Sequence, residues 1–163
     1  MREINVGLLG CGTVGTGVAR LLLNNRDLIA ARLGSALNLK RVADIDITRD
    51  RGVRFPEGVL VNDARRLIAE PGIDIVVEMI GGEGIAKELP LSAIASGRHV
   101  VTANKALLAA HGNELFRAAA AKGVDLYFEA SVGGCMPIIK TLRESLVGNR
   151  ISDCRGMHSN GIS

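Results

Sequence analysis

Three glycines near the start of the chain have a spacing that suits the binding of a diphosphate. Gly10, Gly12 and Gly15 stand in the stretch GLLGCGTVGTG and form a G-x-G-x-x-G pattern. In such a pattern the first glycine allows a tight turn, the second lets a pyrophosphate approach the backbone, and the third lets a helix pack closely on a strand. The pattern is common by itself, so its meaning depends on the elements around it.

Those elements strengthen the interpretation. Residues 4–9 (INVGLL) form a short apolar run, which is typical of a buried parallel strand. In residues 13–24 the apolar side chains recur at helical spacing. The three glycines therefore join a strand to an amphipathic helix, whose N-terminal amides attract phosphate. We predict a dinucleotide-binding turn rather than a merely structural one.

Short apolar runs and helical stretches alternate along the rest of the chain. Further strands are predicted at 37–43, 58–61, 73–80, 99–102 and 124–128, with one more candidate at 150–156. Helices are predicted at 64–70, 85–95, 105–122 and 137–146, and His111-Gly112 is expected to interrupt the third of these. Repeated strand–helix units predict an α/β domain with a doubly wound parallel sheet and helices on both faces.

The adenosine end of the cofactor is expected just after the second strand. Asp44 or Asp46 there suits a ribose 2′-hydroxyl and hence NAD. Three arginines follow closely and suit the 2′-phosphate of NADP: Arg49, Arg51 and Arg54. A solvated charged loop explains any single one of these residues equally well, so the choice between NAD and NADP stays open.

Parallel sheets bind ligands beyond the carboxyl ends of their strands. Ile80 ends the fourth predicted strand and Gly81 follows it at this edge, and the stretches TANK and EASVGG follow the fifth and sixth strands. Lys105, a charged residue between an apolar strand and an apolar helix, is therefore expected at the cofactor edge. The alternative is a solvated lysine at a helix start, but functional residues gather on such loops.

Composition excludes several other classes of protein. Aromatic residues make up 2% of the chain, so the basic residues between positions 40 and 66 lack the aromatic partners of a nucleic-acid site. Apolar runs are too short to span a membrane, and no leader pattern precedes the first strand. The three cysteines are odd in number and far apart, and we interpret Cys11 as a packing residue. We expect a cytoplasmic protein that binds neither nucleic acid nor membrane.

Three blocks, GLLGCGTVGTGVARLL, TANKALLAAHG and FEASVGGCMPIIKTLRESL, together resemble the cofactor-binding half of homoserine dehydrogenases. The resemblance implies a Rossmann-type fold, NADP or NAD as cofactor, and interconversion of L-homoserine and L-aspartate 4-semialdehyde in threonine, methionine and isoleucine biosynthesis. The lysine of the family's NK pair is implicated in catalysis, and its match is Lys105. A cation there suits a substrate alkoxide that forms or disappears as hydride moves.

The same resemblance implies further site residues. Thr13 and Val14 match cofactor contacts, and Thr102 and Asn104 match residues beside the nicotinamide. The family's monovalent cation, usually sodium, is bound by main-chain carbonyls after the sixth strand, at positions that match Glu129, Val132, Gly134 and Met136. From the residues alone, a turn that only reverses the chain is the preferred interpretation of this segment.

The family continues beyond this length with a substrate and dimerisation domain. We therefore assign residues 1–150 to the cofactor domain and residues 151–163, which diverge from the family's pattern, to the start of the second domain. The chain alone is expected to bind cofactor with little turnover, and the full-length family form is expected to be a homodimer or larger. A related amino-acid dehydrogenase and a stand-alone dinucleotide-binding sensor are the alternatives.

Overall fold

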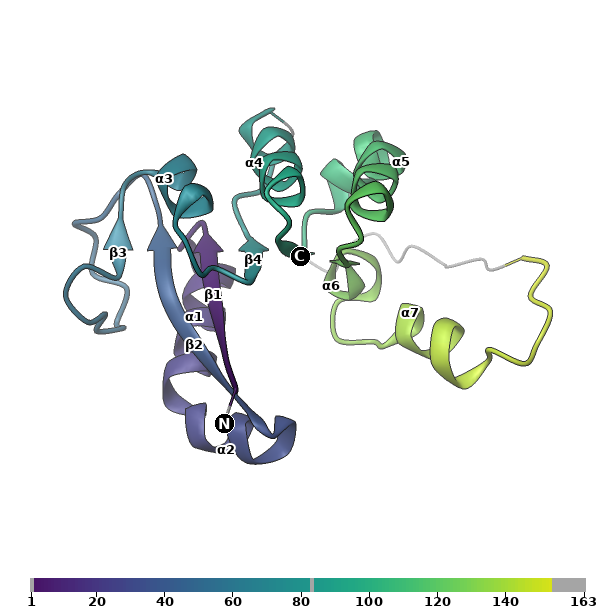
Figure 1. The fold of residues 1–163 in the computed structure, drawn as a ribbon, viewed down its shortest axis with the longest axis horizontal. Helices are drawn as coiled ribbons and strands as arrows, with labels where there is room; N and C mark the ends of the chain where they lie inside the picture. The colour runs from purple at the N-terminus through teal and green to yellow at the C-terminus, as the bar shows by residue number, and fades with distance from the viewer. Residues whose placement is uncertain (1, 83, 154–163) are drawn as a thin grey trace, which may run out of the picture.

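The computed structural model describes residues 2–82 and 84–153, and these form one twisted parallel sheet with helices on both faces (Figure 1). The strand order is β3-β2-β1-β4-β5-β6, and every neighbouring pair is parallel. The strands are β1 (Arg2–Leu9), β2 (Ser35–Ala43), β3 (Leu60–Val61), β4 (Ile75–Glu78), β5 (His99–Thr102) and β6 (Leu126–Tyr127). The order reverses between β1 and β4, which confirms the doubly wound prediction and places the switch point there.

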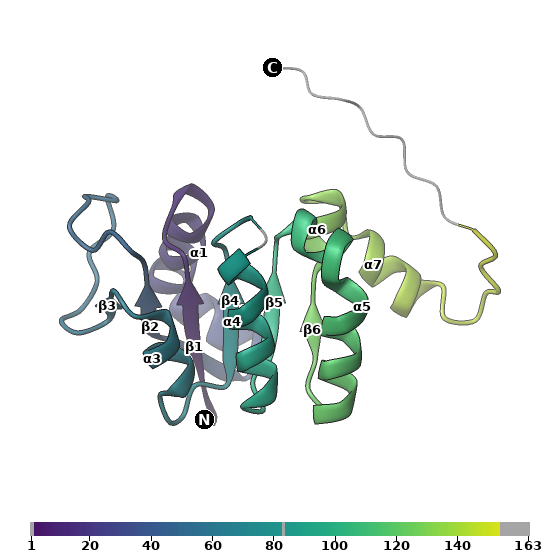
Figure 2. The ribbon, with the colours of Figure 1, turned by 90° about the horizontal axis from the view of Figure 1, so that it is seen from above.

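Helices form a layer on each side of this sheet (Figures 1 and 2). On one side lie α1 (Thr13–Asn24) and α2 (Arg26–Leu33), next to β1 and β2. The opposite side carries α3 (Ala64–Ala69), α4 (Gly84–Ala95) and α5 (Lys105–Lys122). Beyond β6 the chain forms α6 (Glu129–Gly133), α7 (Ile138–Lys140) and a π-helical turn (Thr141–Ser145).

The two layers bury two separate aliphatic cores. Side chains along a strand point to opposite faces in turn, so Leu8 joins the core under α1 while Leu9 joins the core under α3, α4 and α5. Both leucines are fully buried. Cys11 is also buried in the first of these cores, which confirms its interpretation as a packing residue.

The structure corrects several sequence-based boundaries. Helix α5 is continuous through His111 and Gly112, because Gly112 is buried and tertiary packing overrides its low helix propensity. The predicted strands 58–61, 73–80 and 124–128 shorten to β3, β4 and β6. The predicted helix 137–146 is present as two consecutive helical segments, α7 and the π-helical turn, and Pro137 is the N-cap residue of α7. The candidate strand 150–156 extends outside the described residues, and residues 150–153 lie in no strand.

Helix α1 approaches β1 so closely that only glycine fits at the contact. Gly10 turns the chain out of β1 with a φ of 86°. A Cβ added to Gly15 would lie 2.0 Å from the carbonyl oxygen of Gly10. Since that neighbour is backbone, no side-chain adjustment relieves the overlap.

We predict that Gly15→Ala lowers the free energy of unfolding by about 2 kcal/mol or more, because the methyl group displaces backbone. Gly17 lies in the same helix, and a Cβ there meets nothing within 4 Å. Gly17→Ala is therefore the matched control, and it should raise the free energy of unfolding by up to about 1 kcal/mol through helix propensity. Urea unfolding followed by circular dichroism measures both values. Equal effects of the two substitutions would contradict the close approach.

Candidate dinucleotide-binding site

Two cavities lie next to each other at the carboxyl edge of the sheet. The first, of about 280 Å³, lies at the ends of β1, β2 and β4, and its lining includes Gly10, Gly12, Asp44, Met79 and Ile80. The second, of about 160 Å³, is lined by Val14, Met79, Ile80, Gly81, Ala103 and Asn104. The two share the segment after β4, so together they form one extended site across the switch point, as a molecule with two nucleotide halves requires.

The N-terminus of α1 faces this site without a capping side chain. Gly12 is its N-cap residue and supplies no side-chain hydrogen bond, and the first turn holds no acidic residue. By contrast, the carboxylate of Asp63 caps α3 and the amide of Asn104 caps α5. Gly12 is exposed, and a Cβ there would meet nothing within 4 Å. An uncapped helix end beside open backbone fits an anionic diphosphate.

Asp44, at the end of β2, contacts the glycine-rich turn directly. Its Oδ2 accepts a hydrogen bond of 2.6 Å from the backbone N–H of Cys11. Its Oδ1 lies 3.1 Å from Nη2 of Arg51, whose Nε donates to the Cys11 carbonyl oxygen at 2.8 Å. The Arg51 side chain is 5% exposed. The structure therefore brings Asp44 and Arg51 to the turn and leaves Arg49 exposed on the following loop.

Asp46 organises that loop instead of facing the first cavity. Its Oδ1 accepts hydrogen bonds from the hydroxyl and the backbone N–H of Thr48 and from the backbone N–H of Arg49. These bonds, the Thr48 hydroxyl first, and the charge of Arg51 lower the pKa of Asp46 below its usual 3.8. Of the two candidate aspartates, only Asp44 lines the first cavity.

Glu78 is a buried carboxylate at this edge that sequence reasoning missed. It ends β4 and is fully buried. Its Oε1 accepts hydrogen bonds from the backbone N–H groups of Ile80 and Gly81, at 2.8 and 3.2 Å. Its Oε2 accepts a 2.5 Å bond from the Thr102 hydroxyl, which in turn accepts a bond from the N–H of Asn104. Glu78 thereby ties the segment after β4 to the segment after β5. The signal available in the sequence was Glu78 itself, an acidic residue between the apolar run IVV and the glycine pair that follows.

Asn104 and Lys105 follow at the start of α5. The Asn104 side chain is buried, and it accepts from the N–H of Leu107 at 3.0 Å and donates to the Gly82 carbonyl at 2.7 Å. Lys105 is exposed and directly follows this anchored residue of the second cavity. None of the ion pairs between described residues involves Lys105.

The predicted cation positions lie in and just after α6. The Glu129 carboxylate accepts the N–H groups of Ile139 and Lys140, each at 2.8 Å, so its side chain caps α7. The Met136 carbonyl accepts from the N–H of Ile138 at 2.9 Å. Residues 2–82 and 84–153 contain no cluster of three or more His, Cys, Asp or Glu side chains that suits a metal ion. A site made of main-chain carbonyls stays a prediction.

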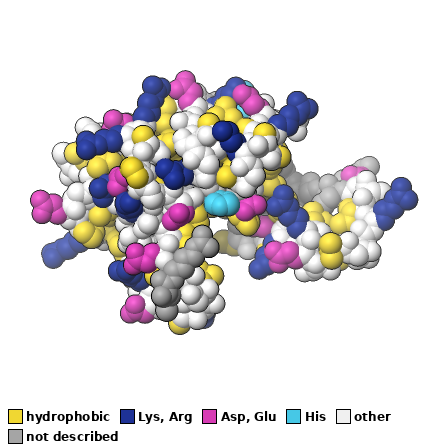
Figure 3. Space-filling view, viewed as in Figure 1, with side chains coloured by type: hydrophobic (Ala, Val, Ile, Leu, Met, Phe, Trp, Pro, Cys, Tyr) yellow, Lys and Arg dark blue, Asp and Glu magenta, His cyan; other side chains and the backbone are white. Residues whose placement is uncertain are grey.

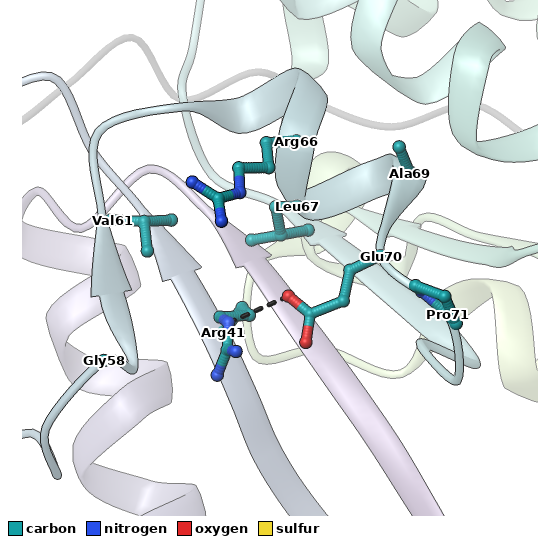
Figure 4. A pocket seen from close by; sticks show the side chains of 8 residues that line it. All are labelled: Arg41, Gly58, Val61, Arg66, Leu67, Ala69, Glu70 and Pro71. Atoms are coloured by element: carbon teal, nitrogen blue, oxygen red, sulfur yellow. Dashed lines mark ion pairs between the residues drawn. The ribbon is translucent and has the colours of Figure 1, made fainter.

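A separate cavity of about 600 Å³ lies between β2, β3 and α3 (Figure 4). Its main polar feature is an ion pair of 2.8 Å between Nε of Arg41 and Oε2 of Glu70. These groups satisfy each other, and the cavity lies away from the glycine-rich turn. Basic and acidic side chains are interspersed over the face seen in Figure 3. Within the described part of the chain, no helix is long and apolar enough to cross a membrane.

The comparisons with known proteins agree with this geometry. The family model described as "Homoserine dehydrogenase, NAD binding domain" matches residues 10–129. The chain belongs to the homoserine dehydrogenase family. It is 46% identical over 163 residues to the homoserine dehydrogenase of Neisseria gonorrhoeae and 47% identical over 154 residues to that of Corynebacterium glutamicum. It covers 37% and 34% of these relatives' lengths, so it spans about a third of them.

Solved homoserine dehydrogenases have the same fold. The enzyme from Thiobacillus denitrificans superposes with a TM-score of 0.84 at 48% identity, over 92% of this chain and 35% of that one. A hyperthermophilic archaeal homoserine dehydrogenase in complex with NADPH superposes with a TM-score of 0.71 at 25% identity, over 90% of this chain and 50% of that one.

We predict that Glu78→Gln lowers the free energy of unfolding by about 2 kcal/mol, because an amide in place of the carboxylate loses charge-assisted hydrogen bonds in a buried site. Glu88→Gln is the matched control, since the Glu88 side chain is 65% exposed in its pair with Arg65. It should change the free energy by less than about 1 kcal/mol. Urea unfolding of both variants measures the difference, and an equally small loss in Glu78→Gln would show that the network does not hold the two segments.

Proposed function

We propose that this chain is the NAD(P)-binding part of a homoserine dehydrogenase, which interconverts L-homoserine and L-aspartate 4-semialdehyde. The observation that carries the proposal is the uncapped N-terminus of α1 beside the open backbone at Gly12, located between the two cavities. NADP or NAD supplies the hydride carrier when bound. The relative solved with NADPH supports NADPH as one of the cofactors.

In this proposal each half of the cofactor meets a different set of residues. The pyrophosphate lies against the turn and the start of α1: Gly10, Gly12, Thr13, Val14 and Gly15. The adenosine half enters the first cavity, beside Asp44 and the loop that carries Arg49. The nicotinamide half enters the second cavity, where Ile80, Gly81 and Asn104 line the wall. Thr102 acts here through its hydrogen bonds with Glu78 and Asn104.

Lys105 is the residue proposed to act on the substrate. It is exposed at the first position of α5, next to the nicotinamide cavity. Its ammonium group stabilises the alkoxide that forms as hydride reaches the aldehyde carbon, and it donates the proton that completes homoserine. In the reverse reaction, the oxidation of homoserine, the neutral amine of Lys105 accepts the proton of the substrate hydroxyl.

The rest of the active site is proposed to lie in the part of the relatives that this chain does not span. That part supplies carboxylates and a second lysine for the substrate, and it forms a homodimer or larger assembly. Without it the carbinol carbon is not held against the nicotinamide, so turnover by this chain alone is low. Main-chain carbonyls of Glu129, Val132, Gly134 and Met136 are proposed to bind a monovalent cation, and the cytoplasm is the proposed location.

We predict that Gly12→Asp abolishes binding of both NADPH and NADH without loss of stability. Asp is a favourable N-cap residue and meets no atom here, so the fold is retained. Its carboxylate occupies the place of the pyrophosphate and repels it. Isothermal titration calorimetry with each cofactor, together with thermal unfolding, measures the two effects. Unchanged cofactor affinity in a folded Gly12→Asp variant would overturn the proposed site.

The role of Lys105 needs the rest of the enzyme. We predict that Lys105→Met, in a chain completed with the remaining part of the N. gonorrhoeae relative, lowers kcat by about 100-fold or more. The Kd for NADPH should change by less than about threefold, because the lysine acts on the substrate rather than on the diphosphate. Lys87→Met is the control, since Lys87 pairs with Glu114 at 2.9 Å on α4 and α5 and should leave kcat unchanged. Equal kcat in the Lys105 variant and its parent would reduce Lys105 to a surface residue.

A further inference from the structure

The ion pair of Asp44 and Arg51 forms hydrogen bonds with the peptide groups on both sides of Cys11. The N–H of Cys11 donates to Asp44, and its carbonyl accepts from Nε of Arg51. The two charged groups meet at 3.1 Å, which closes a ring of contacts around this residue. Cys11 stands between Gly10 and Gly12 in the glycine-rich turn. The end of β2 is thereby fixed to the turn that is proposed to bind the pyrophosphate.

Arg51 is fully engaged in this arrangement. Its Nη1 donates to the Arg49 carbonyl at 2.9 Å, and its Nη2 also donates to the Asp46 carbonyl. With its side chain 5% exposed, the guanidinium is not available as a direct ligand for a phosphate. This differs from the role that its position in the sequence suggested.

The ion pair is oriented relative to the first cavity. Asp44 lines that cavity, whereas Arg51 is absent from its lining and lines a different cavity, together with Arg49 and Phe55. The carboxylate of Asp44 therefore borders the proposed adenosine site, whereas the guanidinium of Arg51 does not. An aspartate at the end of the second strand favours a ribose 2′-hydroxyl and repels a 2′-phosphate. A cation held 3.1 Å from the Asp44 carboxylate offsets that repulsion.

The net charge of the surrounding loop also depends on Arg51. Residues 44–54 contain three acidic and three basic side chains, so the loss of one arginine leaves the segment with a net negative charge. The other two arginines of this segment, Arg49 and Arg54, are both exposed. The preference of the site for a ribose 2′-hydroxyl or a 2′-phosphate thus depends on whether Asp44 stays paired with Arg51.

We propose that Arg51 is a specificity-determining residue that lets the site accept NADP by masking the charge of Asp44, rather than by touching the cofactor. The inference rests on the proposed function and deepens it. It predicts opposite effects for the two partners of the pair. Removal of Arg51 exposes the carboxylate and disfavours the 2′-phosphate, whereas removal of the Asp44 charge favours it. A purely structural role would change the affinities for both cofactors equally.

The test is calorimetric titration of the 163-residue chain and its variants with NADPH and with NADH. Arg51→Gln should lower the affinity for NADPH by about tenfold or more relative to that for NADH, the size expected for one unmasked charge close to a phosphate. Asp44→Asn should shift the ratio of affinities toward NADPH. Arg51→Lys, which keeps the charge, should hold the ratio close to that of the parent chain.

Arg41→Gln is the matched control for net charge. Arg41 also stands in a charged pair, with Glu70, but in the cavity of Figure 4 and away from the turn. Loss of the Arg41 charge should leave the ratio of the affinities for NADPH and NADH unchanged. Equal changes for both cofactors in Arg51→Gln, or no shift in Asp44→Asn, would overturn the masking role. If Arg51→Gln does not fold, Asp44→Asn and Arg51→Lys decide the question. A folded parent chain that binds neither cofactor would instead overturn the proposed function.

Discussion

The contact between α1 and β1 at Gly15 is the constraint on which the rest of the site depends. A side chain there would meet the carbonyl of Gly10 at 2.0 Å, so the helix can lie this close to the strand only with glycine. The close approach sets the direction of α1 and brings its uncapped N-terminus to the carboxyl edge of the sheet. The ion pair of Asp44 and Arg51 then fixes the turn itself, through the peptide groups of Cys11. Backbone fit and buried charge together prepare a place for a diphosphate.

The other half of the site is built by a hydrogen-bond network rather than by backbone fit. Glu78 joins the segments after β4 and β5, and the hydrogen-bond network continues through Thr102 to Asn104. Asn104 then caps the N-terminus of α5 and fixes its first turn. Lys105 is therefore exposed on a rigid helix start rather than on a free loop. This arrangement suits a catalytic group, since its position must be set to a fraction of an ångström.

Most of the fold could be predicted because most strands and helices carry their own period. The glycine-rich turn, Asn104 and Lys105 could be placed at one edge because parallel strands share a carboxyl end. The pairing of Asp44 with Arg51 could not, since a sequence shows charges but not which of three nearby arginines is buried. Helix α2 was missed because none of its residues is buried, so it has no apolar period. The prediction of a helix break at Gly112 was wrong because the burial of this residue outweighs its low helix propensity.

The most direct test of the account is amide chemical-shift mapping of the isotope-labelled chain during titration with NADPH. A dinucleotide site at the carboxyl edge of the sheet predicts saturable shifts at residues 10–16, at Asp44 and at residues 80–82, which lie at this one edge although they are far apart in sequence. Residues that line the Arg41–Glu70 cavity should not shift. Shifts centred on that cavity, or none at saturating NADPH in a folded chain, would contradict the claim that this chain forms a dinucleotide site.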